Sequence, residues 1–286
     1  DYPTRTITFV LPFPSGSGTD QSAREAANDI TRRTGQPVIV ENKPGANGLI
    51  AAQQVARAAP DGYTVFITTM TTQSVNPFLY KKLPYDPVAD FIPVAMISKT
   101  AMVLVVRNTE DQPKSVAELT ARMQAAGSKL SFASGNTSSL VAGKTYSNAV
   151  SSPALHVPYK GIPQAVTDLM AGAVDFMFSD LTVANPLVQQ GRLRGLGVTG
   201  PTRASTLPDV PTMREAGMPI ELSVWNGAYV PAKTPHAVVV RLNELLNQAT
   251  QSKQGQERFK QTGGTVDTMS PEEFAKFNEQ EVQICG

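Results

Sequence analysis

RTITFVLPFPSGSGTD, residues 5–20, decides the fold of this chain. It begins with an apolar strand at 7–11 and runs through a turn of Pro, Ser and Gly directly into a helical pattern. The first backbone N–H groups of a helix have no partner within the helix, and together with the helix dipole they favour an anion. The segment therefore predicts a strand, an anion-binding turn and a helix, in that order.

The same arrangement follows a second time along the chain. A second apolar strand at 38–40 leads into the glycine-rich turn ENKPGANG, residues 41–48, and then into the helix start LIAAQQVARAA. Strands and helices that alternate in this way are typical of right-handed βαβ units on a parallel sheet. Two such turns side by side indicate a binding site for an acidic small molecule.

The rest of the chain continues the alternation and predicts a second α/β sheet. The predicted strands are 5–11, 37–41, 63–68, 94–107, 130–133, 154–157, 173–178, 192–198 and 221–230, and the predicted helices are 19–34, 48–59, 115–126, 138–150, 162–171, 183–190, 235–251, 254–262 and 271–283. The runs 94–107 and 221–230 are expected to cross between the sheets. We therefore predict an α/β protein with domain 1 at 1–99 plus 228–286, domain 2 at 100–227, and a hinge of crossover strands.

The composition is that of an ordinary globular protein and excludes several classes. With 17% charged residues and a net charge of +1, the chain has no basic surface for nucleic acid. A single cysteine, Cys285, and two histidines, His156 and His236, predict neither a disulfide framework within one chain nor a metal site. The longest apolar run, 101–106, is far below the roughly 18 residues of a membrane span. Because the chain begins at Asp1, we expect an N-terminal segment to have been removed.

Catalytic motifs are incomplete in this sequence. Gly16 and Gly18 follow a strand as in a dinucleotide fingerprint, but Gln21 stands where its third glycine belongs, and Asp20 would repel a pyrophosphate. No G-x-S-x-G elbow is present. We therefore expect no cofactor and no catalytic residues. The alternative is an α/β enzyme that acts on a small organic acid, with Asp20 or Asp180 as its base.

Polar side chains follow several predicted strands, where open α/β sheets bind their ligands. Asp20 suits two compatible roles, complementing the helix dipole and contacting a ligand. In the first half the other candidates are Thr69, Thr71 and Gln73, and in the second half they are Ser134, Asn136, Thr137, Ser138, Tyr159 and Asp180. An ordinary loop tyrosine and a loop-capping aspartate are the alternatives for Tyr159 and Asp180.

The chain resembles the extracytoplasmic solute receptors of tripartite tricarboxylate transporters, known as Bug receptors. The similarity lies in YPTRTITFVLPFPSGSGTD, VIVENKPGANG, APDGYTVF, LPYDPVADFIPVAMI, HVPYKG, GAVDFMFSD and LPDVPTMREAG, in this order over nearly the whole chain. The resemblance implies a type II periplasmic binding protein, a two-domain Venus flytrap. It implies a monomeric periplasmic receptor, secreted through a removed signal peptide, that hands a di- or tricarboxylate, an acidic amino acid or an aromatic acid to membrane transporter subunits. A ligand-sensing subunit for signalling would use the same clamp.

The resemblance also implies which residues touch the ligand. One carboxylate would be held by the first and second turns, mostly through backbone N–H groups and bridging water, and the other domain would close over it. The implied residues are Phe13, Ser15, Gly16, Ser17, Gly18, Asp20, Gly45, Ala46, Asn47 and Gly48 in the first domain, and Ser134, Gly135, Asn136, Thr137, Ser138, Tyr159 and Asp180 in the second. This chain has PFPSGSG where PFPPGG-type sequences predominate, so Ser15 and Ser17 add hydroxyls near the carboxylate.

Overall fold

A computed structural model describes residues 1–126 and 129–285 of the chain. It divides into two compact units, and each has its own α/β layers. Unit 1 comprises Asp1–Lys99, Trp225–Phe259 and Thr265–Gly286, and unit 2 comprises Thr100–Val224 and Lys260–Gly264. Two long strands, β4 (Phe91–Arg107) and β9 (Ser223–Pro231), carry the chain from one unit to the other.

The sheet of unit 1 places the N-terminal strands in parallel at one edge. Its order is β2 (Val38–Asn42), β1 (Ile7–Leu11), β3 (Thr64–Thr69), β9 and the first part of β4. β1 runs parallel to both β2 and β3, whereas β9 is antiparallel to β3. The carboxyl ends of β1, β2 and β3, with the turns that follow them, therefore lie along one edge of the sheet.

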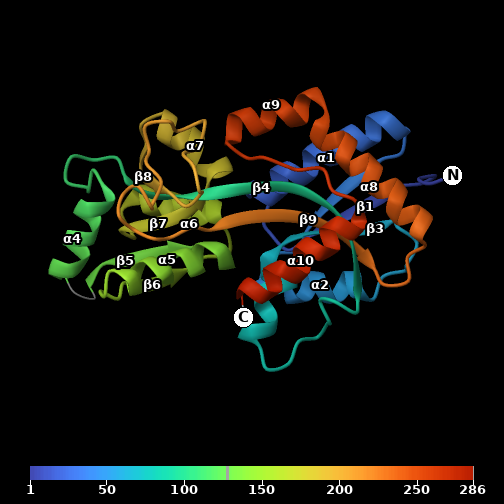
Figure 1. Ribbon diagram of the computed structural model, residues 1–286, viewed down its shortest axis with the longest axis horizontal. Helices are drawn as coiled ribbons and strands as arrows, with labels where there is room; N and C mark the ends of the chain where they lie inside the picture. Colours follow the sequence, from blue (N-terminus) through green and yellow to red (C-terminus); the bar gives the residue numbers. More distant parts are fainter. Residues whose placement is uncertain (127–128, 286) are drawn as a thin grey trace. The chain divides into compact units, whose positions relative to one another are not determined.

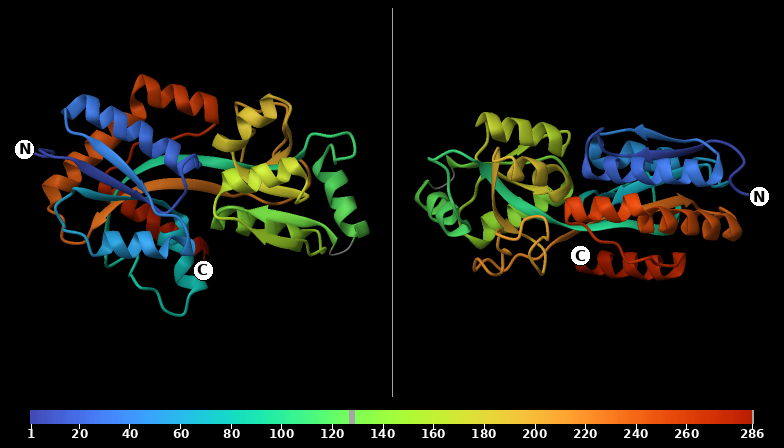
Figure 2. Two further views of the ribbon diagram at one scale, coloured as in Figure 1. Left: turned by 180° about the vertical axis from the view of Figure 1, so that it is seen from behind. Right: turned by 90° about the horizontal axis from the view of Figure 1, so that it is seen from above.

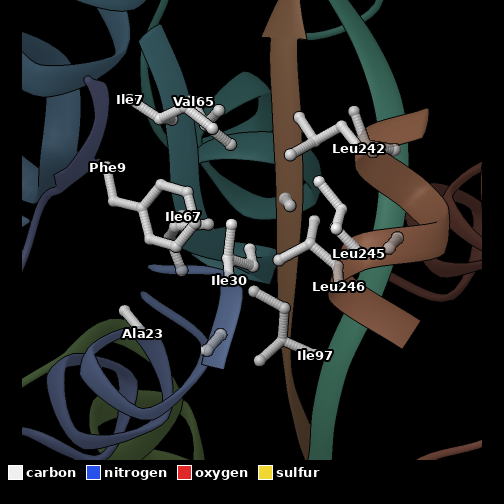
Figure 3. Packing of buried hydrophobic residues seen from close by; sticks show 14 of the residues in the cluster. Ile7, Phe9, Ala23, Ile30, Val65, Ile67, Ile97, Leu242, Leu245 and Leu246 are labelled. Carbon is white, nitrogen blue, oxygen red and sulfur yellow. The ribbon is translucent and has the colours of Figure 1, made fainter. Parts of the chain in front are cut away.

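Alternating side chains of these strands build a core on each face of the unit 1 sheet. On one face Ile7, Phe9 and Ile67 pack against α1 (Gly18–Thr34) and α8 (His236–Gln251), as Figure 3 shows. On the other face Val10, Phe66 and Tyr229 pack against α2 (Leu49–Ala56) and α10 (Pro271–Cys285). Figure 1 shows this helix–sheet–helix layering, which holds the strand ends rigidly.

The sheet of unit 2 repeats the design with different elements. Its order is the second part of β4, β7 (Phe176–Asp180), β5 (Ser131–Ser134) and β6 (Leu155–Pro158), and β8 (Leu193–Val198) also pairs with β4. One face carries α4 (Val116–Ala126) and α5 (Thr137–Ala149), and the other carries α6 (Ile162–Ala171) and α7 (Leu181–Gln189), as the left view of Figure 2 shows. Because β5 is parallel to β6 and β7, the ends of all three again share one edge.

The α/β prediction is confirmed, and every predicted strand and helix is present. Their ends differ by up to three residues, as at β4, which begins at Phe91 instead of residue 94. Three short elements were not predicted: η1 (Ala46–Gly48), the wide helical turn η2 (Thr71–Val75) and α3 (Asn76–Leu79). α9 (Lys253–Thr262) agrees closely with its predicted range. Within residues 1–126 and 129–285, no helix combines the length and apolarity needed to cross a membrane.

Candidate functional site

The first turn of unit 1 leaves two backbone donors free at the start of α1. Ser17 is the N-cap, and its hydroxyl accepts a hydrogen bond from Asp20 N at 3.2 Å, while its carbonyl accepts one from Gln21 N at 3.0 Å. Among the described residues, the N–H groups of Gly18 and Thr19 have no acceptor. Free N–H groups at the positive end of a helix, here one of 17 residues, favour an anion without the need for a fixed cation.

Asp20 gives this turn its shape. Its side chain is buried, and its carboxylate accepts hydrogen bonds from Gly16 N at 2.9 Å, Asn42 Nδ2 at 2.9 Å and Arg24 Nε at 3.1 Å. Burial alone would raise the pKa of Asp20, but these donors outweigh it and hold the pKa below its usual value. The carboxylate is therefore ionised, and its hydrogen-bond donors come from the protein itself. Its role is to fix the position of the turn.

Asn42 joins the first turn to the end of β2. Its amide donates to Phe13 O at 3.0 Å as well as to Asp20, and its oxygen accepts from Arg24 Nη2 at 3.0 Å. The sequence did not single out Asn42 or Arg24, because neither lies in the turn itself. Phe13 is half-buried, whereas Ser15 is exposed and its hydroxyl belongs to the open surface of the turn.

The second turn packs against the first through a glycine. Gly48 has φ +80°, and a Cβ atom there would lie 2.5 Å from Thr72 Cγ2 and 3.1 Å from Pro12 Cβ, so a larger residue is not accommodated. The exposed Asn47 has φ 50°; its side chain donates to Tyr80 OH at 2.5 Å, and its carbonyl accepts from Asn76 Nδ2 at 2.9 Å. The backbone of the turn is therefore fixed from two sides.

The polar run after β3, which we predicted as a candidate ligand-binding segment at a strand end, is helical from Thr71 to Val75. Thr71 and Gln73 lie on η2, and Thr69 is the last residue of β3; all three are buried. The hydroxyl of Thr69 donates to Thr71 Oγ1 at 3.2 Å, and Gln73 Nε2 donates to Pro87 O at 3.3 Å. This segment therefore lies beside the two turns, at the same edge of the unit 1 sheet.

In unit 2 the turn between β5 and α5 repeats the N-terminal arrangement. Asn136 caps α5: its Oδ1 accepts from Ser139 N at 2.8 Å, and Ser139 Oγ accepts from Asn136 N at 3.3 Å. Within the described part of the chain, the hydroxyls of Thr137 and Ser138 have no hydrogen-bond partner, although both residues are buried. Donors that the protein itself does not use therefore lie at this helix start too.

Asp180 is the last residue of β7 and precedes α7, a position slightly different from the predicted one beyond the strand end. It is buried, and the side chain of Asn136 favours its ionised form. Its Oδ1 has no hydrogen-bond partner among the described residues. Burial raises the pKa of Asp180 to about 6, only partly opposed by the Asn136 hydrogen bond.

Two other residues at this edge are bound within unit 2. Ser134 Oγ lies 2.6 Å from His156 Nε2, a contact that the sequence did not predict because β5 and β6 are separated along the chain. Burial, aided by Lys144, lowers the pKa of His156. Tyr159, which was predicted to face a ligand, donates its hydroxyl to Asp168 Oδ2 at 2.8 Å, so that proton is already in use.

The comparisons with known proteins agree with this geometry. A family model described as tripartite tricarboxylate transporter family receptor matches residues 22–286. The chain is similar to the solved periplasmic binding protein BugD, at 34% identity and a TM-score of 0.94, covering 99% of this chain and 96% of that chain.

Two further similar structures were solved with acids bound. MatC from Rhodopseudomonas palustris, with bound malate, is 30% identical with a TM-score of 0.93, covering 99% of this chain and 98% of that chain. An R. palustris protein with adipate is 31% identical with a TM-score of 0.95, covering 99% and 96%.

These likenesses confirm the predicted flytrap fold and exclude the enzyme alternative. The family model extends over most of the chain, and BugD matches it almost from end to end. The chain belongs to the tripartite tricarboxylate transporter receptor family, the solute-binding Bug receptors.

Proposed function

We propose that this receptor works in the periplasm, captures a small carboxylate between its two units and delivers it to a membrane transporter of the tripartite tricarboxylate type. One carboxylate of the ligand binds the turn edge of unit 1, and the far end of the ligand meets the β5–α5 and β7–α7 turns of unit 2. The protein acts as a monomer. Its precursor carries a signal peptide that is removed during secretion.

The free N–H pair of Gly18 and Thr19 is the observation that carries this proposal. Ser17 and Asp20 accept hydrogen bonds from the N–H groups of Gly16, Asp20 and Gln21, whereas Gly18 N and Thr19 N have no acceptor within the described residues and remain for a ligand. Hydrogen bonds to a charged group contribute more than those between neutral groups, and the dipole of α1 adds to them. The malate and adipate seen in two similar structures support an acidic ligand.

A pair of variants at Gly18 tests the carboxylate position. Ser17 has ψ 161°, the backbone that precedes proline readily, and Gly18 is the first helical residue, where proline is favoured. Gly18→Pro therefore removes one N–H while keeping the helix start, and Gly18→Ala keeps the N–H as a matched control. We expect Gly18→Pro to weaken binding about 10- to 100-fold for every acid that binds, and Gly18→Ala by less than about threefold.

Ligands for this test come from a thermal-shift screen of di- and tricarboxylates, acidic amino acids and aromatic acids, with neutral sugars as controls. Isothermal titration calorimetry then gives the dissociation constants of the three proteins. A folded Gly18→Pro variant that binds as tightly as the unaltered chain would remove the first turn from the site. Delivery is measured as ligand uptake by cells that have the transporter, with and without this receptor.

A further inference from the structure

We propose that Asp180 makes this receptor select carboxylates whose far end carries a hydrogen-bond donor, a hydroxyl or an ammonium group, over plain diacids of the same length. This inference rests on the proposed function, because it concerns the end of the ligand opposite the first turn. It assigns a specificity-determining role to one oxygen of one side chain.

The first argument is that the protein leaves this oxygen unused. Asp180 Oδ1 has no partner among the described residues, and the residue is 8% exposed. Asp180 also occupies the N-cap position of α7 without capping it, since its side chain accepts no hydrogen bond from that helix. A buried acceptor without a donor is unfavourable, so a donor from outside the chain would be bound favourably there.

The second argument is that Asn136 and Ser179 already form hydrogen bonds elsewhere. Asn136 is fixed by its own capping bond to Ser139 N, so only its amide N–H groups remain for Asp180. Ser179 Oγ donates to the backbone carbonyl of Asp180 at 3.2 Å, which leaves the carboxylate without that hydroxyl. The same edge holds the unpartnered hydroxyls of Thr137 and Ser138. The open acceptor is therefore a property of the folded unit 2.

The third argument is electrostatic. Burial and the side chain of Asn136 shift the pKa of Asp180, and no charged side chain within the described residues contributes to that shift. Titratable side chains on the elements and segments around β7 in unit 2 include Arg107 on β4, Lys144 and Tyr146 on α5, His156 on β6, Tyr159 after β6, Asp168 on α6, Asp175 before β7, and Lys260. At neutral pH an ionised Asp180 would attract an ammonium group and accept a hydrogen bond from a hydroxyl, a contact that a plain diacid of the same length cannot make.

Calorimetry with matched acids tests the selection. The ligands are succinate, malate and aspartate at one length, and glutarate, 2-hydroxyglutarate and glutamate at the next. At pH 7.5 we expect the preferred donor-bearing acid to bind at least about tenfold more tightly than the plain diacid of its length. Asp180→Asn should reduce that ratio to below about threefold. Gly18→Pro serves as the control, since it should weaken both acids and preserve the ratio.

A second measurement follows the proton of Asp180 and does not depend on the ratio. Binding of a donor favours the ionised form, so the unaltered protein should release protons on binding near pH 6.5, seen as different heats in phosphate and imidazole buffers. Asp180→Asn should not release them, and because both proteins bind the same ligand, protonation of the ligand itself cancels in the comparison.

The possible outcomes separate this inference from the proposed function. The inference would be overturned if Asp180→Asn left unchanged either the ratio of affinities for the donor-bearing acid and the plain diacid or the proton release on binding. Tight binding confined to acids without a donor, such as adipate or benzoate, would also overturn it and leave the proposed function intact. If no acid of any class binds, the proposed function itself is wrong.

Discussion

Asp20 shows how a single buried carboxylate can fix the shape of a turn through its own hydrogen bonds. It brings together the N–H of Gly16 and the side chains of Asn42 and Arg24, which come from three different elements or turns. Its environment lowers the pKa of Asp20. An ionised acid held in this way stabilises the fold above its unfolded pKa, and this stabilisation is lost as the pH falls through the lower folded value.

We therefore expect Asp20→Asn to lower the free energy of unfolding by roughly 1–3 kcal/mol between pH 5 and 8, because the donors at Gly16 and Asn42 lose an ionic acceptor. The difference should shrink below about pH 4, where the carboxyl is protonated in the unfolded chain. Urea unfolding at several pH values measures this. Glu244→Gln, which removes an exposed ion pair with Arg241, is the control and should cost less than about 1 kcal/mol. Equal losses in the two variants would contradict the structural role of Asp20.

Residue patterns predicted the first turn better than they predicted its supports. Ser17, Gly18 and Asp20 were identified because a strand, a glycine-rich turn and a helix follow one another directly in the sequence. Asn42 was missed because its contact with Asp20 exists only after β2 pairs with β1. Arg24 lies four residues after Asp20 on α1, and this spacing alone could have indicated their ion pair. The bond between Ser134 and His156 was missed for the same reason, since it requires the pairing of β5 with β6.

At the scale of elements, a buried polar relay links the start of α1 to the two strands that connect the units. Thr19 Oγ1 donates to Asn226 Oδ1 at 2.7 Å, and Asn226 Nδ2 donates to Ser98 Oγ at 2.7 Å. Ser98 lies on β4 and Asn226 on β9, each near the point where its strand passes into unit 2. The relay thus positions the residue whose N–H is proposed to hold the ligand.

Asn226→Ala should lower the free energy of unfolding by roughly 1–3 kcal/mol, because the buried hydroxyls of Thr19 and Ser98 would both lose a partner. In a double-mutant cycle, adding Thr19→Val to Asn226→Ala should cost at least about 0.5 kcal/mol less than the sum of the two single changes. Asn108→Ala, at an exposed asparagine that donates to Gly191 O, is the control. Strict additivity in the cycle would show that the relay does not couple these elements.

The predicted elements agree with the structure where the hydrophobic periodicity and the residues typical of helix ends indicate the same boundaries. Helix α6 has the predicted bounds, and α1 ends at Gly35, whose φ of 73° is the left-handed conformation expected there. The turn η2 and the helix α3 were missed because both are short and the run from Thr71 to Leu79 has no helical hydrophobic periodicity. Contacts distant in sequence hold this segment, such as Tyr85 OH donating to Thr72 O at 2.7 Å and Asn76 Nδ2 lying 3.1 Å from Tyr85 OH.

At the scale of the whole molecule, the division of polar groups between two units explains why the proposed ligand needs two ends. Unit 1 offers backbone donors and a fixed turn, which suit a carboxylate of any small acid. Unit 2 offers the open acceptor of Asp180 and the hydroxyls of Thr137 and Ser138, which we propose distinguish one acid from another. General affinity would then come from unit 1, and choice of ligand from unit 2. A ligand long enough to touch both would favour the closed arrangement, since only that state provides both sets of contacts.

Small-angle X-ray scattering of the receptor, with and without a saturating acid identified by calorimetry, tests this clamp most directly. We expect the radius of gyration to fall when the acid binds and to stay unchanged with a neutral sugar. Gly18→Pro should need a higher concentration of the acid for the same fall. Tight binding by calorimetry with no change in the scattering curve would contradict capture by closure of the two units.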